Sequence, residues 1–190
     1  MKVISGTLKG RNIIGYNIDG TRPTMDRVKE SMFATIQDYV KDSAVLDLFA
    51  GSGNLGIEAI SNGATKCYFI DNNKEVIKVL NQNITNLNIK SNSKVILSDW
   101  KKSLNDFSNQ NIKFDLIFVD PPYDYDVYEK ILDKVSTLNL LNKDGLIILE
   151  YSNLKLKDSY NNLILYKEKK YGNKSIKIYK NNWQHFPYVI

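Results

Sequence analysis

The sequence predicts an α/β fold, in which one mostly parallel sheet of seven strands is covered by helices on both faces. From residue 44 onward, short apolar runs alternate with stretches whose apolar residues recur at helical spacing. The runs are apolar at consecutive positions, which is typical of parallel strands that are buried on both faces. A chain of 190 residues with 43% hydrophobic residues has the size of a single domain with its own core.

The predicted elements follow one another in a regular order. Five parallel strands are expected, at 44–50, 66–71, 94–98, 114–120 and 144–151. Helices are expected between them, at 53–63, at 73–88, in the polar stretch after residue 98, and at about 125–138. The last two runs, 162–172 and 174–180, are joined by Gly172-Asn173 and predict an antiparallel hairpin at the sheet edge.

Two elements are expected before the sheet. Residues 3–14 alternate around glycines and predict a small hairpin, and residues 21–40 have the pattern of an amphipathic helix. Pro23 and Thr24 mark the expected start of that helix. Because no linker or repeat is visible, we expect one domain over 1–190, with an N-terminal extension at 1–40 and an additional tail at 181–190.

Composition excludes several classes of site. The single cysteine, Cys67, allows no internal disulfide, and with the single histidine, His185, it excludes the usual zinc clusters. No apolar run reaches the roughly 18 residues of a membrane span, and the first residues lack the apolar segment of a secretory signal. We therefore expect a cytoplasmic protein with no metal and no membrane contact. A monomer is expected, although the sequence itself does not give the oligomeric state.

The net charge of +5 is concentrated at the two ends of the chain. Residues 1–30 carry six basic and three acidic side chains, and residues 155–180 carry eight lysines and two acidic side chains, around an acidic middle. This distribution is typical of a protein that binds a polyanion, although solvated surface lysines would explain it as well. The predicted phosphate-binding residues are Lys9, Arg11, Arg22 and Arg27, with the lysines of the C-terminal hairpin expected farther from the site.

A glycine-rich loop from Asp47 to Gly56 follows the first strand. Its spacing, with Asp71 at the end of the next strand, satisfies the pattern of dinucleotide sites. Charge favours a different ligand, because the Asp47 carboxylate would repel a pyrophosphate at the start of the helix. S-adenosylmethionine has no phosphate and brings an ammonium and a sulfonium, so the loop predicts this cofactor.

The predicted cofactor residues are Asp47, Ala50, Gly51, Gly53, Asp71, Asn72, Asp99 and Trp100. Asp71 would accept hydrogen bonds from the ribose hydroxyls, and Asp99 with Trp100 would supply an acceptor and an apolar plate for adenine. For Asp47 and Asp99 a strand-end or helix-capping role remains open, and the glycines could serve the turn alone.

The run Asp120-Pro121-Pro122-Tyr123 follows the fourth strand, at the edge where open parallel sheets bind ligands. Two prolines stiffen the backbone and remove its N–H donors, so their carbonyls and Asp120 form an acceptor-only wall. Such a wall suits the exocyclic amine of a base, whose lone pair becomes more nucleophilic when its N–H groups are held. The predicted catalytic set is Asp120, Pro121 and Tyr123, with Tyr123 stacking on the base; the alternative is a stiff turn.

These motifs resemble the RsmD family of bacterial 16S rRNA (guanine-N2)-methyltransferases. The resemblance covers about residues 3–180 and rests on 4–13, 21–33, 45–59, 114–123 and 169–180. It implies the class I, Rossmann-like methyltransferase fold. It also implies S-adenosylmethionine-dependent methylation of a guanine N2 in 16S rRNA of the assembled or assembling small subunit.

The resemblance also assigns residues. It implies that Asp47, Gly51, Gly53, Asp71 and Asp99 contact the cofactor, that Asp120 and Tyr123 hold the base, and that Arg22 and Arg27 line the site or approach the RNA. The chain departs from the family at Asp71, where glutamate is frequent, and at Asn54, where a small residue is usual. An adenine-N6 or other base-amine methyltransferase, and a non-catalytic RNA-binding assembly factor, remain alternatives.

Overall fold

The computed structural model describes residues 1–15, 26–121, 127–152, 155–172 and 174–182. Its strands are β1 (Ala44–Asp47), β2 (Lys66–Asp71), β3 (Ser93–Leu97), β4 (Phe114–Val119), β5 (Leu141–Tyr151), β6 (Ser159–Tyr160), β7 (Leu163–Tyr171) and β8 (Lys174–Asn181). Its helices are α1 (Asp26–Val40), α2 (Asn54–Ser61), α3 (Lys74–Asn86), α4 (Trp100–Asn109), α5 (Val127–Thr137) and the short 3₁₀ helix η1 (Lys90–Asn92).

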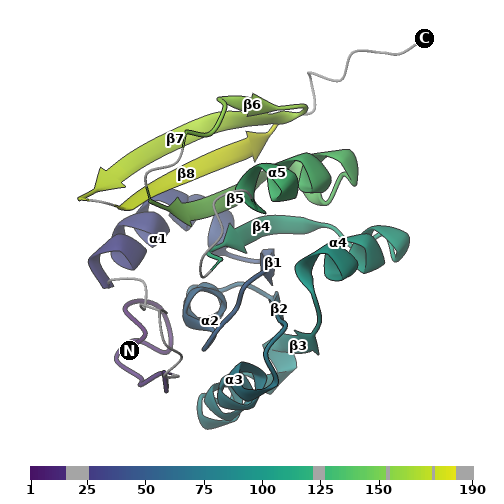
Figure 1. Ribbon diagram of the computed structural model, residues 1–190. Helices are drawn as coiled ribbons and strands as arrows, with labels where there is room; N and C mark the ends of the chain where they lie inside the picture. The colour runs from purple at the N-terminus through teal and green to yellow at the C-terminus, as the bar shows by residue number, and fades with distance from the viewer. Residues whose placement is uncertain (16–25, 122–126, 153–154, 173, 183–190) are drawn as a thin grey trace.

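The strands form one sheet in the order β3-β2-β1-β4-β5-β8-β7-β6 (Figure 1). β1 pairs in parallel with β2 and β4, and β3 and β5 extend the parallel part on either side. β8 is antiparallel to both β5 and β7. The predicted mostly parallel fold is therefore confirmed, with the expected hairpin beyond β5 and the two-residue β6 as an additional strand at that edge.

Two apolar clusters cover the two faces of the sheet. One contains α1, α2 and α3 packed on alternate strand residues such as Val45, Phe118 and Ile148. The other contains α4 and α5 packed on the intervening residues, such as Leu46 and Val119. Because side chains alternate between faces along a strand, this assignment also fixes which face each strand-end residue occupies.

The small hairpin predicted at 3–14 is confirmed. Lys2 and Asn12 form an antiparallel bridge, Val3 N donates to Arg11 O at 3.0 Å, and Ile13 N donates to Met1 O at 2.9 Å. Backbone donors near its turn bind α2. Leu8 N donates to Ser61 Oγ at 2.9 Å, and Thr7 N donates to Ser61 O at 2.8 Å. The predicted start of α1, at Pro23 and Thr24, lies outside the described residues.

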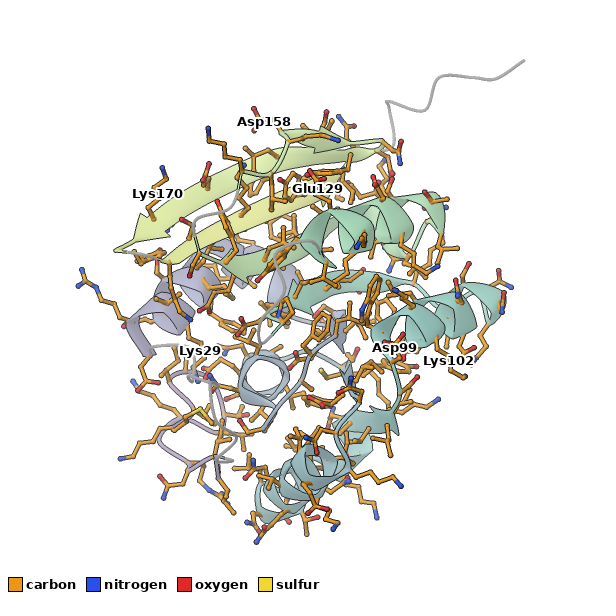
Figure 2. The ribbon with its side chains drawn as sticks, viewed as in Figure 1. Lys29, Asp99, Lys102, Glu129, Asp158 and Lys170 are labelled. Atoms are coloured by element: carbon orange, nitrogen blue, oxygen red, sulfur yellow. The ribbon has the colours of Figure 1, made fainter. Side chains whose placement is uncertain are left out.

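Lys29 of α1 is a buried lysine at the centre of this region (Figure 2). Its Nζ lies 2.9 Å from Glu58 Oε2, and both side chains are 0% exposed. The same Nζ donates to Lys2 O at 2.9 Å and to Asn54 Oδ1 at 2.8 Å. Two of these acceptors belong to α2 and the third to the N-terminal segment, so one ammonium of α1 joins all three segments.

Glu58 of α2 completes the network with its own acceptor bonds. Ser5 N and Ser5 Oγ each donate to its Oε1 at 2.8 Å, and Ile4 N donates to its Oε2 at 3.0 Å. A buried charge pair is tolerated when additional hydrogen bonds satisfy both ions, as here. Lys29 therefore contributes to the fold and not to the basic surface of the N-terminal region.

We predict that Lys29→Ala lowers the free energy of unfolding by about 3–5 kcal/mol, because it leaves the Glu58 carboxylate buried without its counter-ion. Urea unfolding measures this. Lys78→Ala is the matched control, since Lys78 and its partner Glu75 are 72% and 74% exposed and their pair should contribute little. Equal effects of the two substitutions would contradict the structural role of Lys29.

Candidate active site

Four aspartates lie at the carboxyl edge of the parallel strands. Asp47 and Asp71 end β1 and β2, Asp120 directly follows β4, and Asp99 comes two residues after β3. Parallel strands end at the same edge, and β1 and β4 are adjacent where the strand order reverses, which is the usual ligand position in such sheets. The structure therefore brings these predicted residues to one edge of the sheet.

The glycine loop connects β1 to α2 in a conformation that needs glycine. Gly51 has φ 54° and Gly53 has φ 88°, both in the left-handed region. A Cβ on Gly53 would lie 2.6 Å from Leu80 Cδ1 and 2.9 Å from Ile57 Cδ1. Gly53 is thus required by the turn and by the core beneath it, and close approach of a ligand would be a further use of the same residue.

Asp47 lies beneath this loop and is only 3% exposed. Its Oδ2 accepts a hydrogen bond from Gly56 N in the first turn of α2 at 2.9 Å. Burial raises the pKa of the Asp47 carboxyl from 3.8 to about 7, and the nearby Asp71 adds to the rise, whereas the Gly56 hydrogen bond opposes it. The helix-capping role left open for Asp47 is therefore present, and this carboxyl changes its charge near neutral pH.

Asp71 anchors the loop from the next strand. Its Oδ2 accepts from Gly51 N at 3.0 Å, and its Oδ1 accepts from Asn73 N at 2.9 Å. Each carboxylate oxygen can accept a second hydrogen bond, so a half-buried Asp71 keeps the capacity to bind two hydroxyls. Asn72 is exposed beside it, and Ala50 is buried within the loop.

Asp99 serves as the N-cap of α4, which was one of the two roles left open for it. Its Oδ1 accepts from Lys101 N at 2.8 Å and from Lys102 N at 3.4 Å. Trp100 is half-buried at the first position of the helix and packs against the α4–α5 cluster. A role of Asp99 and Trp100 toward adenine remains a prediction.

Asp120 and Pro121 are half-buried directly after β4. Phe118 faces α1, with its ring 5.7 Å from that of Phe33, so the alternation of the strand places Asp120 on the same face. Tyr123 lies outside the described residues, as do Pro122 and Arg22.

The three predicted phosphate-binding residues that the structure describes lie on two different segments of the chain. Arg27 is exposed on the first turn of α1, whereas Arg11 donates from Nη2 to Asn86 O at the end of α3. Lys9 is exposed in the segment that contacts the last residue of α2, Ser61. Since eight helical residues span about 12 Å, Lys9 lies roughly a helix length from the glycine loop. Arg11 lies nearer, because Asn83, three residues before Asn86 on α3, donates to Ser52 O of the loop at 3.0 Å.

The expectation that the C-terminal lysines all lie far from the site is wrong for Lys174. Ser175 pairs with Tyr151, the last residue of β5, so Lys174 starts β8 at the carboxyl edge of the parallel strands. Lys177 is buried and donates to Leu156 O at 3.0 Å, so it is not available to a partner. Lys170, by contrast, is exposed on β7 and projects from the hairpin (Figure 2).

One residue near this edge was not identified from the sequence. Glu150 is an acidic residue directly after the apolar run 145–149 of β5, and that contrast is the signal that could have identified it. Asn54, which the sequence singled out as a departure from the family, accepts with its Oδ1 from the buried Lys29.

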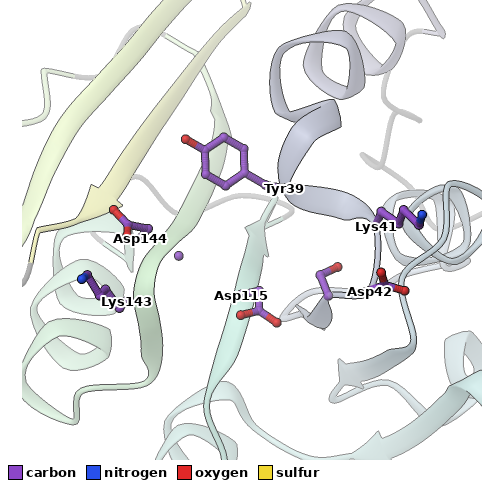
Figure 3. Close-up of a pocket in the computed structure, with 8 residues that line it drawn as sticks. Tyr39, Lys41, Asp42, Asp115, Lys143 and Asp144 are labelled. Atoms are coloured by element: carbon purple, nitrogen blue, oxygen red, sulfur yellow. The ribbon is translucent and has the colours of Figure 1, made fainter.

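A pocket of about 260 Å³ lies at the opposite edge, where β4 and β5 begin (Figure 3). It is lined by Tyr39, Lys41, Asp42, Ser43, Asp115, Lys143, Asp144 and Gly145. Its Asp115 accepts from Ala44 N and Asn142 Nδ2, both at 2.8 Å, and its Asp144 pairs with Lys180 at 3.0 Å. These carboxylates are engaged in the fold, and none of the predicted site residues lines the pocket.

Among the described residues, no three His, Cys, Asp or Glu side chains are grouped so that they could hold a metal ion. In the same part of the chain, no helix has the length and apolar character of a membrane span.

Comparison with known proteins places the chain in a family. The model of the family described as Conserved hypothetical protein 95 matches residues 1–180. The chain belongs to this family. Its relatives include the putative rRNA methyltransferase YlbH of Bacillus subtilis, which is 35% identical over 181 residues, or 95% of this chain and 98% of YlbH. Ribosomal RNA small subunit methyltransferase D of Haemophilus influenzae is also 35% identical, over 95% and 94% of the two chains.

Solved structures agree with this membership in the Conserved hypothetical protein 95 family. The putative methyltransferase YhhF from Escherichia coli superimposes with a TM-score of 0.85 at 30% identity, over 96% of this chain and 98% of its own. An RNA methyltransferase from Salinibacter ruber, in complex with S-adenosyl-L-homocysteine, superimposes with a TM-score of 0.67 at 12% identity, over 85% and 95%. The latter likeness concerns the fold alone. The resemblance to RsmD and the methyltransferase fold are confirmed.

We predict that the stability of the protein falls, relative to that of Asp47→Asn, as the pH rises from about 4 to about 7. The folded protein keeps a proton on Asp47 in this window and the unfolded chain releases it, so raising the pH favours unfolding. The difference should reach at most about 4 kcal/mol, at about 1.4 kcal/mol per pH unit. Urea unfolding at several pH values measures it, and parallel pH trends for the two proteins would contradict the raised pKa.

Proposed function

We propose that this protein is an S-adenosylmethionine-dependent methyltransferase that methylates the exocyclic N2 amino group of a guanine in 16S rRNA. The observation that carries the proposal is the position of Asp120-Pro121. In the β1–β4 pairing Asp47 aligns with Phe118, so Asp120 lies two residues beyond the level of Asp47 on the adjacent strand. This position supports Asp120 and Pro121 as acceptors for an amine next to the glycine loop.

The loop residues fit a cationic cofactor better than a dinucleotide. A buried Asp47 carboxyl with a pKa of about 7 gains stability in its charged form when a cation approaches, and it would oppose a pyrophosphate. Asp71 keeps lone pairs for two ribose hydroxyls beside Gly51. When bound, S-adenosylmethionine would supply the electrophilic methyl group, and S-adenosylhomocysteine would be the product.

Asp120 would act directly on the amine. Its carboxylate accepts an N–H of the amine, which favours a localised lone pair on the nitrogen, and it stabilises the positive charge that develops there. The nitrogen forms its bond to the methyl carbon as the bond from that carbon to sulfur breaks. The extra proton on nitrogen then passes to Asp120 or to water. The stiff Pro121 holds the acceptor wall in place, and positioning contributes the remainder of the rate enhancement.

The RNA substrate is supported by the relatives that are named as rRNA methyltransferases and by the basic ends of the chain. We propose 16S rRNA in the assembled or assembling small subunit as the partner, in the cytoplasm, with Lys9, Arg11 and Arg27 contacting its phosphates. If the protein methylates the amino group of adenine instead, the proposed substrate is wrong but the proposed chemistry of methyl transfer to a base amine still applies.

We predict that S-adenosylhomocysteine binds to the protein and that NAD does not, because a carboxylate and not a phosphate-binding group lies under the loop. Isothermal titration calorimetry measures both ligands under the same conditions. Tight binding of NAD with no response to S-adenosylhomocysteine would falsify the cofactor assignment.

We predict that Asp120→Ala leaves the affinity for S-adenosylhomocysteine nearly unchanged and lowers single-turnover methyl transfer by at least about a hundredfold, the scale of a positioned acid–base or charge-stabilising group. In cells that lack the gene, nucleoside analysis of small-subunit RNA should show the loss of one N2-methylguanosine. The wild-type gene should restore it and the Asp120→Ala gene should not. Loss of N6-methyladenosine instead would identify adenine as the substrate.

A further inference from the structure

Glu150 lies next to Asp120 at the carboxyl edge of the sheet. In the parallel pairing of β4 with β5, Val119 aligns with Leu149, so Asp120 and Glu150 are the next residues on adjacent strands. Phe118 and Ile148, two residues earlier, both belong to the cluster that contains α1. Because side chains alternate along a strand, Asp120 and Glu150 lie on that same face.

Glu150 is 2% exposed, and only one of its carboxylate oxygens is used by the fold. Lys174 Nζ pairs with Oε1, whereas Oε2 is buried and has no hydrogen-bond partner among the described residues. An unpaired buried carboxylate oxygen is unfavourable, so its presence at a ligand-binding edge indicates a function. Neither the glycine loop nor the Asp120-Pro121 wall accounts for it.

Lys174 comes from the neighbouring antiparallel strand. Glu150 pairs with Ile176, so Lys174 lies two residues nearer the carboxyl edge of β5 and on the same face as Ile176. Its side chain is 22% exposed, and an ammonium has three donors, of which the contact with Glu150 uses one. Three groups therefore lie along this edge on consecutive strands. Asp120 after β4 is an acceptor, Glu150 on β5 is a second acceptor, and Lys174 on β8 is a donor.

We propose that Glu150 and Lys174 select guanine at the active site. The inference rests on the proposed base-amine methylation and assigns its specificity. The Watson–Crick edge of guanine presents the N2 amino group, N1–H and O6 in that order. Asp120, Glu150 and Lys174 offer complementary groups in the same order: Asp120 accepts from the amine, Glu150 Oε2 accepts from N1–H, and Lys174 donates to O6.

The discriminating atom is the ring nitrogen beside the amino group. In guanine this nitrogen carries a hydrogen, whereas in adenine and cytosine the corresponding nitrogen is an acceptor. A carboxylate oxygen facing it bonds to guanine and repels the other two bases. A base that leaves this buried acceptor without a hydrogen bond is strongly rejected. The discrimination is much larger than the one that a small difference in the size of the base would give.

The first test uses the wild-type protein and needs no substitution in it. Small-subunit particles are reconstituted with guanosine or with 2-aminopurine at the nucleotide that the protein methylates. 2-Aminopurine keeps the amino group but has an acceptor at N1. We expect single-turnover transfer to 2-aminopurine to be slower by about a hundredfold or more. Equal rates on the two particles would overturn the proposal. Absence of transfer to the guanosine particle as well would count against the proposed function instead.

The second test changes the protein. In Glu150→Gln the donor-only Lys174 must retain the amide oxygen, so the amide NH₂ takes the place of Oε2. Transfer to guanosine should fall by about a hundredfold, and transfer to 2-aminopurine should rise above the wild-type rate on the same particle. This reversal of preference is an outcome that a purely structural role of Glu150 would not produce. Transfer to guanosine at the wild-type rate, or an equal loss on both particles by a folded variant, would overturn the proposal.

Glu168→Gln is the matched control for this variant. Glu168 lies in the same hairpin but on the opposite face, where it accepts from Tyr151 Oη at 2.8 Å and lies 3.9 Å from Lys177. Its substitution should leave the preference between the two particles unchanged. Affinity for S-adenosylhomocysteine should be the same in both variants and in the wild type. If Glu150→Gln does not fold, the comparison of the two particles with the wild-type protein decides.

Discussion

The ion pair between Lys29 and Glu58 is the interaction on which the arrangement of the site depends. Both side chains are fully buried, and their hydrogen bonds join α1, α2 and the N-terminal segment. Through Asn54, the first residue of α2, the same network reaches the end of the glycine loop. A buried ammonium without its carboxylate would be strongly unfavourable, so the three segments keep one relative position, and α1 is held beside the carboxyl edge of the sheet.

The carboxylates at the carboxyl edge of the sheet differ in pKa and in hydrogen-bond partners, because they differ in burial and in the elements that surround them. Asp47 is buried under α2 and has a raised pKa. Asp71 accepts from Gly51 N of the glycine loop with one oxygen and from Asn73 N before α3 with the other, and Asp99 caps α4. The chain has a net charge of +5, yet this edge of the sheet is acidic, so two different binding functions fall on two different surfaces. The acidic edge suits a cationic cofactor and the N–H groups of a base, whereas the basic ends of the chain suit phosphates.

The strand order divides the edge into two halves. The loops after β1, β2 and β3 form the half proposed for the cofactor, and the ends of β4 and β5 with the start of β8 form the half proposed for the base. The antiparallel β8 is essential to the second half, because its direction brings the start of the strand, with Lys174, to the edge where β5 ends. The hairpin thus extends the sheet and brings Lys174 to the half proposed for the base.

The sequence by itself determined the helices and strands of the sheet, the glycine loop, and the aspartates that end the strands, because these depend on local periodicity and on residues adjacent in the chain. Only the tertiary structure decided which charges are buried and what they contact. Lys29 and Glu58 are 29 positions apart and Glu150 and Lys174 are 24 apart, and no local pattern states that such residues meet. The same reason applies to the N-terminal segment: its glycine pattern predicted the small hairpin, but not that Ser5 N and Leu8 N donate to Glu58 and Ser61 of a distant helix. Local patterns describe single elements, whereas the packing of the whole chain determines the partners of a buried polar group.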